Sequence, residues 1–295
     1  MFESGILLLD KPVGLSSNAA LGVAKRVLGI RKAGHTGTLD PMASGLLVLC
    51  FGEATKVAGF LLDSDKAYLA EVRLGATTDT DDAEGEIIQR RPVPDLDEND
   101  IERVLAPLRG PIEQVPPMYS ALKQGGERLY RKARRGESVE RPARSITIHE
   151  LELLGWDGER VRLGVHCSKG TYVRSLARDL GEALGCGAHL SALRRIRSAP
   201  FDRSDAVDLD ALRAMDREQA RALLKPADQA LLLLPDVRLD ETSAARLLTG
   251  QRLSGLDSSA NGLVRVYGPQ GFIGVGEADG QGGLKAKRLI STATQ

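Results

Sequence analysis

The chain has 295 residues, of which 42% are hydrophobic and 27% are charged, and basic and acidic residues balance to a net charge of zero. This composition excludes intrinsic disorder, a collagen-like chain and a small disulfide-stapled protein, and the length predicts about two domains. The longest apolar run, residues 46–51, is too short to span a bilayer. Residues 1–12 lack the basic start of a signal peptide, and the three cysteines lack CxxC spacing. We therefore expect a cytoplasmic protein without membrane segments, disulfides or a zinc site.

The first half of the chain contains two predicted helices and a predicted buried strand. Ser16 and Ser17 are possible N-caps of a helix that Gly29 ends, and the apolar run 46–51 reads as a strand within a buried sheet. Residues 79–100 carry nine acidic and two basic side chains. A second helix is predicted from about Asp97 with its apolar face inward, ending before Gly110.

The second half begins with a basic segment and ends in a glycine-rich tail. Residues 123–144 carry eight basic and three acidic side chains, so the zero total charge conceals a locally basic surface. Such a surface is suited to a polyanion, or is simply a solvated face. Residues 161–167 alternate like a half-buried strand, and Thr171 is a possible cap of a helix running to Gly185. Residues 209–224 read as helical, and residues 262–276 as two strands joined by a turn.

These elements do not alternate as regular βαβ units, so an α+β class is expected. We place a domain boundary near residue 230, with a catalytic region over residues 1–230 and a small, mostly β region over residues 231–295. An insertion over residues 110–150 is expected within the first region.

The stretch GHTGTLDPMASGLL, residues 34–47, is the most unusual part of the sequence. Its three glycines and its proline predict a shaped loop, and a loop mounted on a rigid strand is a frequent position for functional residues. The single carboxylate in it, Asp40, could act as a nucleophile or a general base, or could simply satisfy the donors of an Asp-Pro turn. No second acid, HExxH motif or phosphate-binding loop accompanies it.

Several blocks of the sequence resemble the TruB family of tRNA pseudouridine-55 synthases, in its bacterial standalone form. The resemblance is dense and ordered over residues 5–201 and looser beyond. The blocks are LLLDKPVGLSS (7–17), GHTGTLDPMASGLL (34–47), DKAY (65–68), GATTDTDDAEG (75–85), PPMYSALKQGGERLYRKARRGE (116–137) and CSKGTYVRSLARDLGEALGCGAHLSALRRIRSAPF (167–201).

The resemblance implies a cofactor-free, metal-free reaction in which uracil is detached from C1′ of ribose, rotated, and rejoined through C5. Asp40 would be the catalytic carboxylate, as a nucleophile on C1′ or as a stabiliser of the sugar cation. Arg174 would keep that carboxylate ionised, and Tyr68 would stack on the base and accept the C5 proton. The residues implied to contact the substrate are Lys11, His35, Tyr172 and Leu193.

Tyr172 and Arg174 are two positions apart, and residues at this spacing on a helix point to opposite sides. Both can serve one pocket only if they lie at the turn between a strand and a helix. The sequence Gly170-Thr171 before them is compatible with such a turn.

The resemblance also implies the partner, which is the T arm of tRNA. A uridine stacked in that arm must be flipped out before Asp40 can reach it. The basic segment resembles the family's RNA-gripping insertion, and the C-terminal region resembles a PUA-like RNA-binding domain. The residues implied to grip RNA are Lys123, Arg128, Arg131, Lys132, Arg134 and Arg135.

Two alternative functions remain open at this point. One is an RNA chaperone that opens and refolds the tRNA elbow, and the other is a guide-RNA-dependent synthase of the dyskerin type. A pure binder has no use for a buried carboxylate beside an arginine, and the short tail resembles the standalone enzyme. We expect a monomer without an obligate protein partner.

Overall fold

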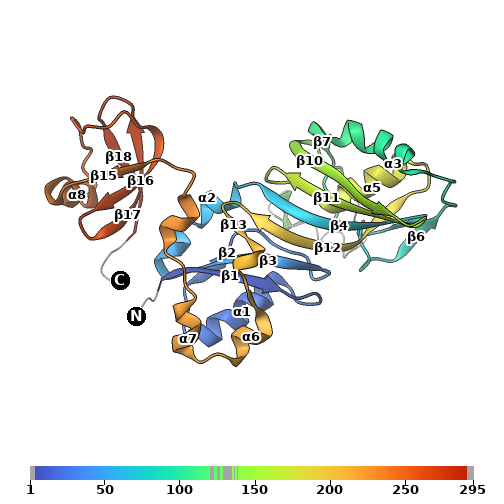
Figure 1. The fold of residues 1–295 in the computed structure, drawn as a ribbon, viewed down its shortest axis with the longest axis horizontal. Coiled ribbons are helices and arrows are strands. Elements are labelled where there is room, and N and C mark those ends of the chain that lie inside the picture. The colour runs from blue at the N-terminus through green and yellow to red at the C-terminus, as the bar shows by residue number, and fades with distance from the viewer. Residues whose placement is uncertain are drawn as a thin grey trace. The chain divides into compact units, whose positions relative to one another are not determined.

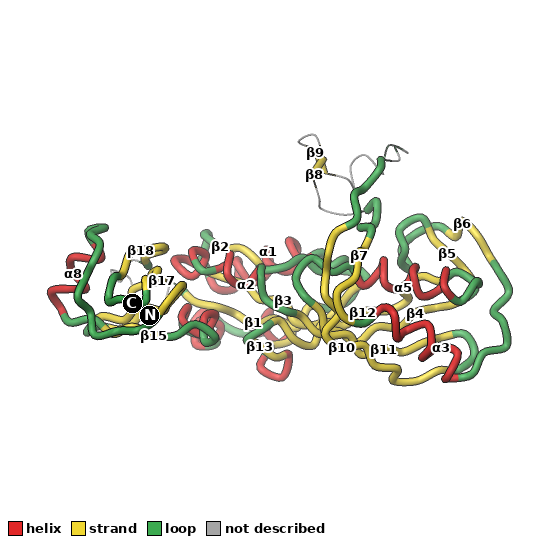
Figure 2. Tube along the Cα trace, turned by 90° about the horizontal axis from the view of Figure 1, so that it is seen from above, coloured by secondary structure: helices red, strands yellow, loops and turns green. Residues whose placement is uncertain are grey.

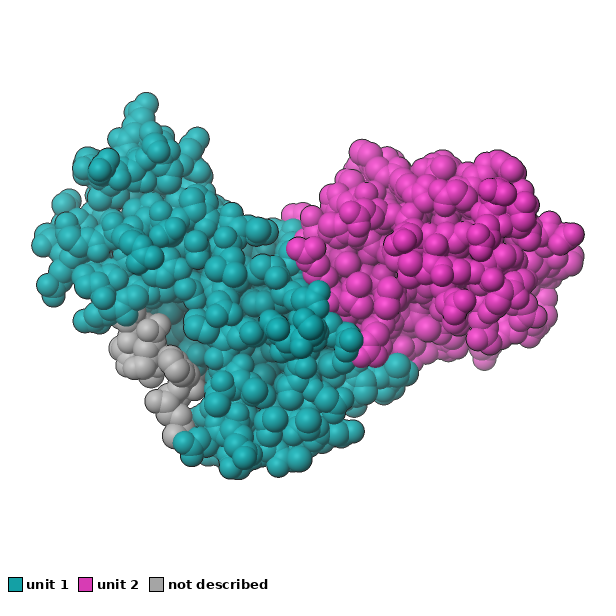
Figure 3. Space-filling view, viewed as in Figure 1, with its two compact units in different colours: residues 1–40, 45–64, 198–295 teal, residues 41–44, 65–197 magenta. Residues whose placement is uncertain are grey.

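The computed structural model has an α+β fold that divides into two compact units, which Figure 3 colours separately. Unit 1 comprises residues 1–40, 45–64 and 198–295, and unit 2 comprises residues 41–44 and 65–197. The α+β class predicted from the sequence is therefore confirmed. In the described part of the chain, no helix is long and apolar enough to cross a membrane. The structure describes residues 4–119, 123–124, 127–128, 135, 137 and 139–290.

Unit 1 is built around a buried pair of antiparallel strands, β1 (Gly5–Lys11) and β3 (Ala43–Phe51). Strand β2 (Ala33–His35) also pairs with β3 (Figure 1). Strand β14 (Val207–Asp208) runs parallel to β1. Every residue of β3 is buried, which explains its continuous apolar run. The expected loop, which begins at residue 34 and ends at the strand predicted from residue 46, is wrong in its extent. The small residues at positions 43–45 fit the buried strand, so that only residues 36–42 connect β2 to β3.

Helix α1 (Ser17–Leu28) has the bounds and caps that the sequence predicts, with Ser16 at its N-cap and Gly29 in the left-handed conformation at its C-cap. The single helix expected over residues 209–224 is wrong. The chain there forms α6 (Leu209–Ala214) and α7 (Arg217–Ala222). Asp216 separates them because its side chain accepts a hydrogen bond from Gln219 N and starts the second helix with a capping box.

The last part of unit 1 is a small β-sheet with one helix packed on it. Its strands lie in the order β15, β16, β17, β18, and β16 and β17 confirm the predicted hairpin. Phe272 and Val275 of β17, together with Ile290, belong to the same buried cluster as Ile6 and Val48 of the central strands. The bounds are β15 (Asp236–Arg238), α8 (Glu241–Leu248), β16 (Asn261–Gly268), β17 (Gly271–Asp279) and β18 (Leu284–Leu289).

Unit 2 is a twisted sheet with its strands in the order β12, β4, β11, β10, β7. Strand β11 confirms the predicted alternation, with Val161, Leu163, Val165 and Cys167 buried. The two-residue strands β8 and β9 stand away from this sheet on the chain that follows β7 (Figure 2). The bounds are β4 (Lys66–Leu74), β5 (Ala76–Thr78), β6 (Ile87–Arg90), β7 (Gly110–Gln114), β8 (Lys123–Gln124), β9 (Glu127–Arg128), β10 (Arg144–Trp156), β11 (Arg160–Cys167) and β12 (Ala188–Ser198).

Among the described residues, two helices pack on this sheet, α3 (Glu98–Leu105) and α5 (Val173–Ala183). Helix α3 confirms the predicted start, because Asp97 forms a capping box with Asp100. It ends at Leu105 rather than near Gly110, because Pro107 lies in a short 3-10 turn over residues 106–108. Two further short elements of the described chain are α2 (Ala58–Leu62) and β13 (Phe201–Asp202).

Gly181 allows α5 to lie directly on the start of β12, and we expect Gly181→Ala to destabilise the protein. A Cβ added at Gly181 would lie 2.2 Å from Ala188 N and 2.4 Å from Ala188 Cβ. Alanine is the better helix former, so the clash must outweigh about 1 kcal/mol of helix propensity, and we expect a net loss of about 2 kcal/mol. Thermal unfolding of Gly181→Ala beside Gly59→Ala tests this, since Gly59 is helical with no atom near its added Cβ. Equal melting temperatures for the two variants would contradict the close contact.

Candidate active site

Asp40 lies in the short loop over residues 36–42, and the part of this loop that precedes Asp40 is fixed to unit 1. The loop leaves β2 after His35, and Thr36 N donates to Val48 O at 3.0 Å. Thr36 is buried, whereas His35 and Asp40 are half-buried. Asp40 is followed by Pro41, and the ring of a proline restricts the residue before it to extended backbone conformations. The backbone of the candidate catalytic carboxylate is thus restricted on its C-terminal side.

The turn between β1 and α1 and the first residue of α1 lie against this loop. Lys11, at the end of β1, is fully buried, and its Nζ donates to Pro12 O at 2.8 Å and to Leu15 O at 2.6 Å. Ser17 is the first residue of α1, and its hydroxyl bonds the main chain of Leu39 in the loop. Ser17 Oγ donates to Leu39 O and accepts from Leu39 N. In the structure, Lys11 therefore stabilises the turn that follows β1. Its expected contact with substrate stays a prediction.

Tyr68 and Leu193 lie on strands of unit 2. Tyr68 is on β4, in register with Val165 of β11, and Leu193 is on β12. Both side chains are half-buried. A half-buried tyrosine on a rigid strand presents a flat apolar surface with one polar end, which is suited to stacking on a base.

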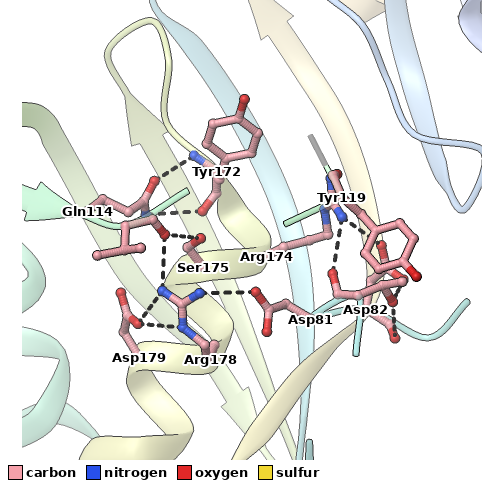
Figure 4. Close-up of polar contacts among 11 residues, drawn as sticks. Asp81, Asp82, Gln114, Tyr119, Tyr172, Arg174, Ser175, Arg178 and Asp179 are labelled. Atoms are coloured by element: carbon pink, nitrogen blue, oxygen red, sulfur yellow. Dashed lines mark hydrogen bonds and ion pairs between the residues drawn. The ribbon is translucent and has the colours of Figure 1, made fainter. Parts of the chain in front are cut away.

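The start of α5 shows whether Tyr172 and Arg174 lie on a regular helix or at the turn before it. Tyr172 occupies the N-cap position with extended backbone angles, φ −104° and ψ 107°, so the two residues do lie at the strand-to-helix turn. Thr171 is not the cap that the sequence suggests, because its hydroxyl donates instead to Ser168 O at 3.0 Å. The side-chain amide of Gln114, which is buried, accepts from Tyr172 N at 2.8 Å and donates to Tyr172 O at 3.1 Å (Figure 4).

Arg174 is buried, and its guanidinium contacts three groups from two separate segments of unit 2, the loop of Thr80 and Asp82 and the segment of Tyr119 (Figure 4). It donates to Thr80 O at 3.1 Å and to Tyr119 O at 2.9 Å, and it lies 3.4 Å from Asp82 Oδ2. The side chains of Arg174 and Asp82 are 7% and 4% exposed. An ion pair as deeply buried as this one is stable only with further hydrogen bonds, and Asp82 Oδ1 accepts them from Thr80 Oγ1 and Glu84 N.

A second arginine, Arg178, fixes the same acidic loop one helical turn later (Figure 4). Its guanidinium pairs with Asp81 at 3.1 Å and with Asp179 at 2.9 Å, and it donates to Val115 O. Asp81 has a positive φ of 62°, which is unusual for a residue other than glycine. Burial raises the pKa of Asp81, and the neighbouring Arg178 and Arg174 oppose that rise.

The predicted RNA-gripping residues are only partly described. Lys123 and Arg128 lie on β8 and β9, where their backbones pair with each other. Arg135 is exposed and its Nε donates to Glu137 at 2.7 Å. Arg131, Lys132 and Arg134 lie outside the described residues.

The structure brings together residues that the sequence analysis treated apart. Arg174 forms an ion pair with Asp82 of the GATTDTDD block. Tyr172 N donates a hydrogen bond to the side chain of Gln114, at the end of β7. Neither Asp82 nor Gln114 was predicted as a site residue. Four acidic positions in residues 79–84 were a signal for Asp82, since such a loop needs cationic partners. No local pattern marks Gln114.

Comparison with known families adds to this geometry. Residues 25–173 match the TruB family pseudouridylate synthase N-terminal domain. Residues 174–232 match the tRNA pseudouridylate synthase B C-terminal domain, and residues 235–290 match the pseudouridine synthase II TruB C-terminal region.

Individual relatives match over nearly the whole chain. A tRNA pseudouridine synthase B from Aromatoleum aromaticum is 57% identical over 98% of this chain and 93% of its own length. One from Xanthomonas axonopodis pv. citri is 54% identical over 97% and 94%. Among solved structures, a Cbf5-Nop10-Gar1 complex is 27% identical with a TM-score of 0.72, covering 99% of this chain and 84% of that chain. An H/ACA RNP bound to a substrate RNA containing 2′-deoxyuridine is 25% identical with a TM-score of 0.74, covering 98% and 86%.

Proposed function

Because this chain belongs to the TruB family of pseudouridylate synthases, we propose that it isomerises a uridine of tRNA to pseudouridine, at position 55 in the T loop. The identity of 57% along nearly the full length to a tRNA pseudouridine synthase B carries this proposal. The same relatives do not favour the chaperone and the guide-dependent alternatives. The Cbf5-Nop10-Gar1 complex and the H/ACA RNP share the fold at the lower identities of 27% and 25%.

In the proposed reaction, the bond between N1 of uracil and C1′ breaks, and a bond between C5 and C1′ forms. Asp40 faces C1′ as a nucleophile or as the counter-charge of a sugar cation, and Arg174 keeps its carboxylate ionised. Tyr68 stacks on the flipped base and accepts the proton that leaves C5, while N1 gains a proton. Lys11, His35, Tyr172 and Leu193 contact the substrate. The rigid anchoring of Arg174 supports this assignment, because a fixed cation stabilises charge without rearrangement during the reaction.

Release of tritium from C5 tests the proposed reaction directly. The wild-type protein is incubated with an unmodified tRNA transcript carrying tritium at C5 of every uridine. We expect release equivalent to one uridine per tRNA, and no release when uridine 55 is replaced by cytidine. Tight binding without release would contradict the enzymatic proposal, and unchanged release from the cytidine transcript would contradict the assigned position.

The basic segment of residues 123–144 is proposed to clamp the T arm of the tRNA. Replacing Arg131, Lys132, Arg134 and Arg135 together by alanine should weaken tRNA binding and flatten its dependence on salt. Loss of four phosphate contacts lowers the slope of log K against log salt by about 3 to 4. Binding titrations between about 50 and 200 mM salt measure that slope.

The matched control replaces four exposed arginines of unit 2 that lie outside the segment. It should retain the wild-type slope, whereas an unchanged slope in the first variant would remove the clamp assignment. The control residues are Arg73, Arg103, Arg160 and Arg162.

We further propose a division into a catalytic region of residues 1–230 and a PUA-like RNA-binding region of residues 231–295. The protein is proposed to act in the cytoplasm as a monomer without an obligate protein partner. Light scattering of the free protein and of its tRNA complex measures the stoichiometry, and a mass of two chains per tRNA would contradict it.

A further inference from the structure

Ser17 makes two buried hydrogen bonds to the residue that precedes Asp40. Its Oγ accepts from Leu39 N at 2.8 Å and donates to Leu39 O at 2.9 Å. Both residues are buried, with Ser17 2% and Leu39 3% exposed. A hydroxyl offers one donor and two acceptor sites, so this side chain takes up both main-chain polar groups of a residue 22 positions away. Neither group of Leu39 is left to a neighbouring strand, although β2 and β3 lie on either side of the loop.

This contact fixes the peptide unit that leads into Asp40. The carbonyl of Leu39 and the N–H of Asp40 belong to one planar peptide group. A hydrogen bond that sets the direction of the carbonyl therefore also sets the position of Asp40 Cα. On the other side of Asp40, the ring of Pro41 restricts the backbone to extended angles. The carboxylate is thus held from both sides, by Ser17 before it and by Pro41 after it.

The position of Ser17 is itself fixed by the framework of unit 1. The buried Nζ of Lys11 bonds Pro12 O and Leu15 O, which shapes the turn between β1 and α1. Ser17 is the first residue of α1, so its backbone belongs to that helix. The hydroxyl that reaches Leu39 is therefore carried between a strand with a fixed turn and a helix.

We propose that Ser17 is a positioning residue for the isomerisation, acting through Leu39 on the placement of Asp40. This inference rests on the proposed function, because it assigns Asp40 as the group that faces C1′. A misplacement of about 1 Å at a reacting group can cost about 100-fold in rate. Loss of the Ser17 hydroxyl leaves two buried main-chain groups of Leu39 without this partner, so the loop must shift to satisfy them.

The test compares Ser17→Ala with its matched control Ser16→Ala. Both variants lose one hydroxyl at the start of α1, but only the first loses the contact to the loop. We expect Ser17→Ala to lower the single-turnover rate of tritium release by about 100-fold, with the tRNA dissociation constant within about threefold of wild type. Ser16→Ala should lower the melting temperature, because it removes an N-cap, and should keep the wild-type rate. Ser17→Thr, which retains the hydroxyl, should recover most of the lost rate.

The inference is overturned if Ser17→Ala and Ser16→Ala have equal rates, or if the loss in Ser17→Ala lies wholly in the tRNA dissociation constant. If Ser17→Ala does not fold, Ser17→Cys replaces it, since a thiol of similar size hydrogen-bonds weakly. An intermediate rate loss in folded Ser17→Cys then supports the inference, and a wild-type rate overturns it. Failure of the proposed function is distinguishable, because the wild-type protein itself would then release no tritium.

Discussion

We expect Asp40→Asn to abolish tritium release from C5-labelled tRNA while leaving tRNA affinity within about threefold of wild type. Asparagine has nearly the same shape as aspartate, so binding contacts are retained, but its amide can neither attack C1′ nor carry negative charge beside a sugar cation. Removal of a nucleophile typically costs about 10⁴-fold or more in rate, which corresponds to about 5 kcal/mol of transition-state stabilisation. Single-turnover release and filter binding, run on the same preparations, measure the two quantities.

The control for this variant is Asp95→Asn, which removes an exposed carboxylate far along the chain from the loop. It should behave as wild type in both assays. Equal release from Asp40→Asn and wild type would show that the loop over residues 36–42 is not the catalytic one. A variant that no longer binds tRNA would reassign Asp40 to substrate binding.

Arg174→Lys keeps the positive charge but should lower the rate by at least about 100-fold and also lower the melting temperature. The planar guanidinium reaches Thr80 O, Tyr119 O and Asp82 together. An ammonium group is a point charge and cannot reproduce that fork. The carboxylate of Asp82 would then remain buried with a poorer partner, and breaking such a pair costs about 3 to 5 kcal/mol.

Arg178→Lys is the matched control, because Arg178 lies on the same helix and also pairs with an aspartate. Its side chain is 23% exposed, so water can compensate for part of the loss, and we expect a smaller change in rate. Measurement of rate, tRNA dissociation constant and melting temperature for both variants separates catalysis from stability. A wild-type rate in Arg174→Lys would contradict the role proposed for the guanidinium.

Elements with complete local signals were predictable from the sequence. Helix α1 has a serine cap at one end and a glycine at the other, and β11 has strict alternation because one of its faces is buried. The break between α6 and α7 also had a local signal, since Asp216 and Gln219 have the spacing of a capping box. The start of β3 had none, because Ala43, Ser44 and Gly45 are typical of a loop and become a strand through burial.

The candidate site was predictable only where a motif marked it. Asp40, Tyr68 and Arg174 lie in blocks with a family resemblance, and the position of Tyr172 before the helix followed from its spacing to Arg174. The residues that hold them could not be found in this way. Ser17 reaches Leu39 across 22 positions and Gln114 reaches Tyr172 across 58, and such pairs are formed by the fold rather than by local sequence.

The buried cluster that joins the C-terminal sheet to the central strands has a consequence for how the protein unfolds. Phe272, Val275 and Ile290 share that cluster with Ile6 and Val48, from the opposite end of the chain. A chain ending at residue 230 would expose this apolar surface to water, at about 25 cal/mol for each Å². Thermal unfolding of unit 1 should therefore be a single cooperative transition, in which the central strands and the C-terminal sheet unfold together. The apolar surroundings of Ile6 and Val48 are accordingly complete only once residues 272–290 have been synthesised.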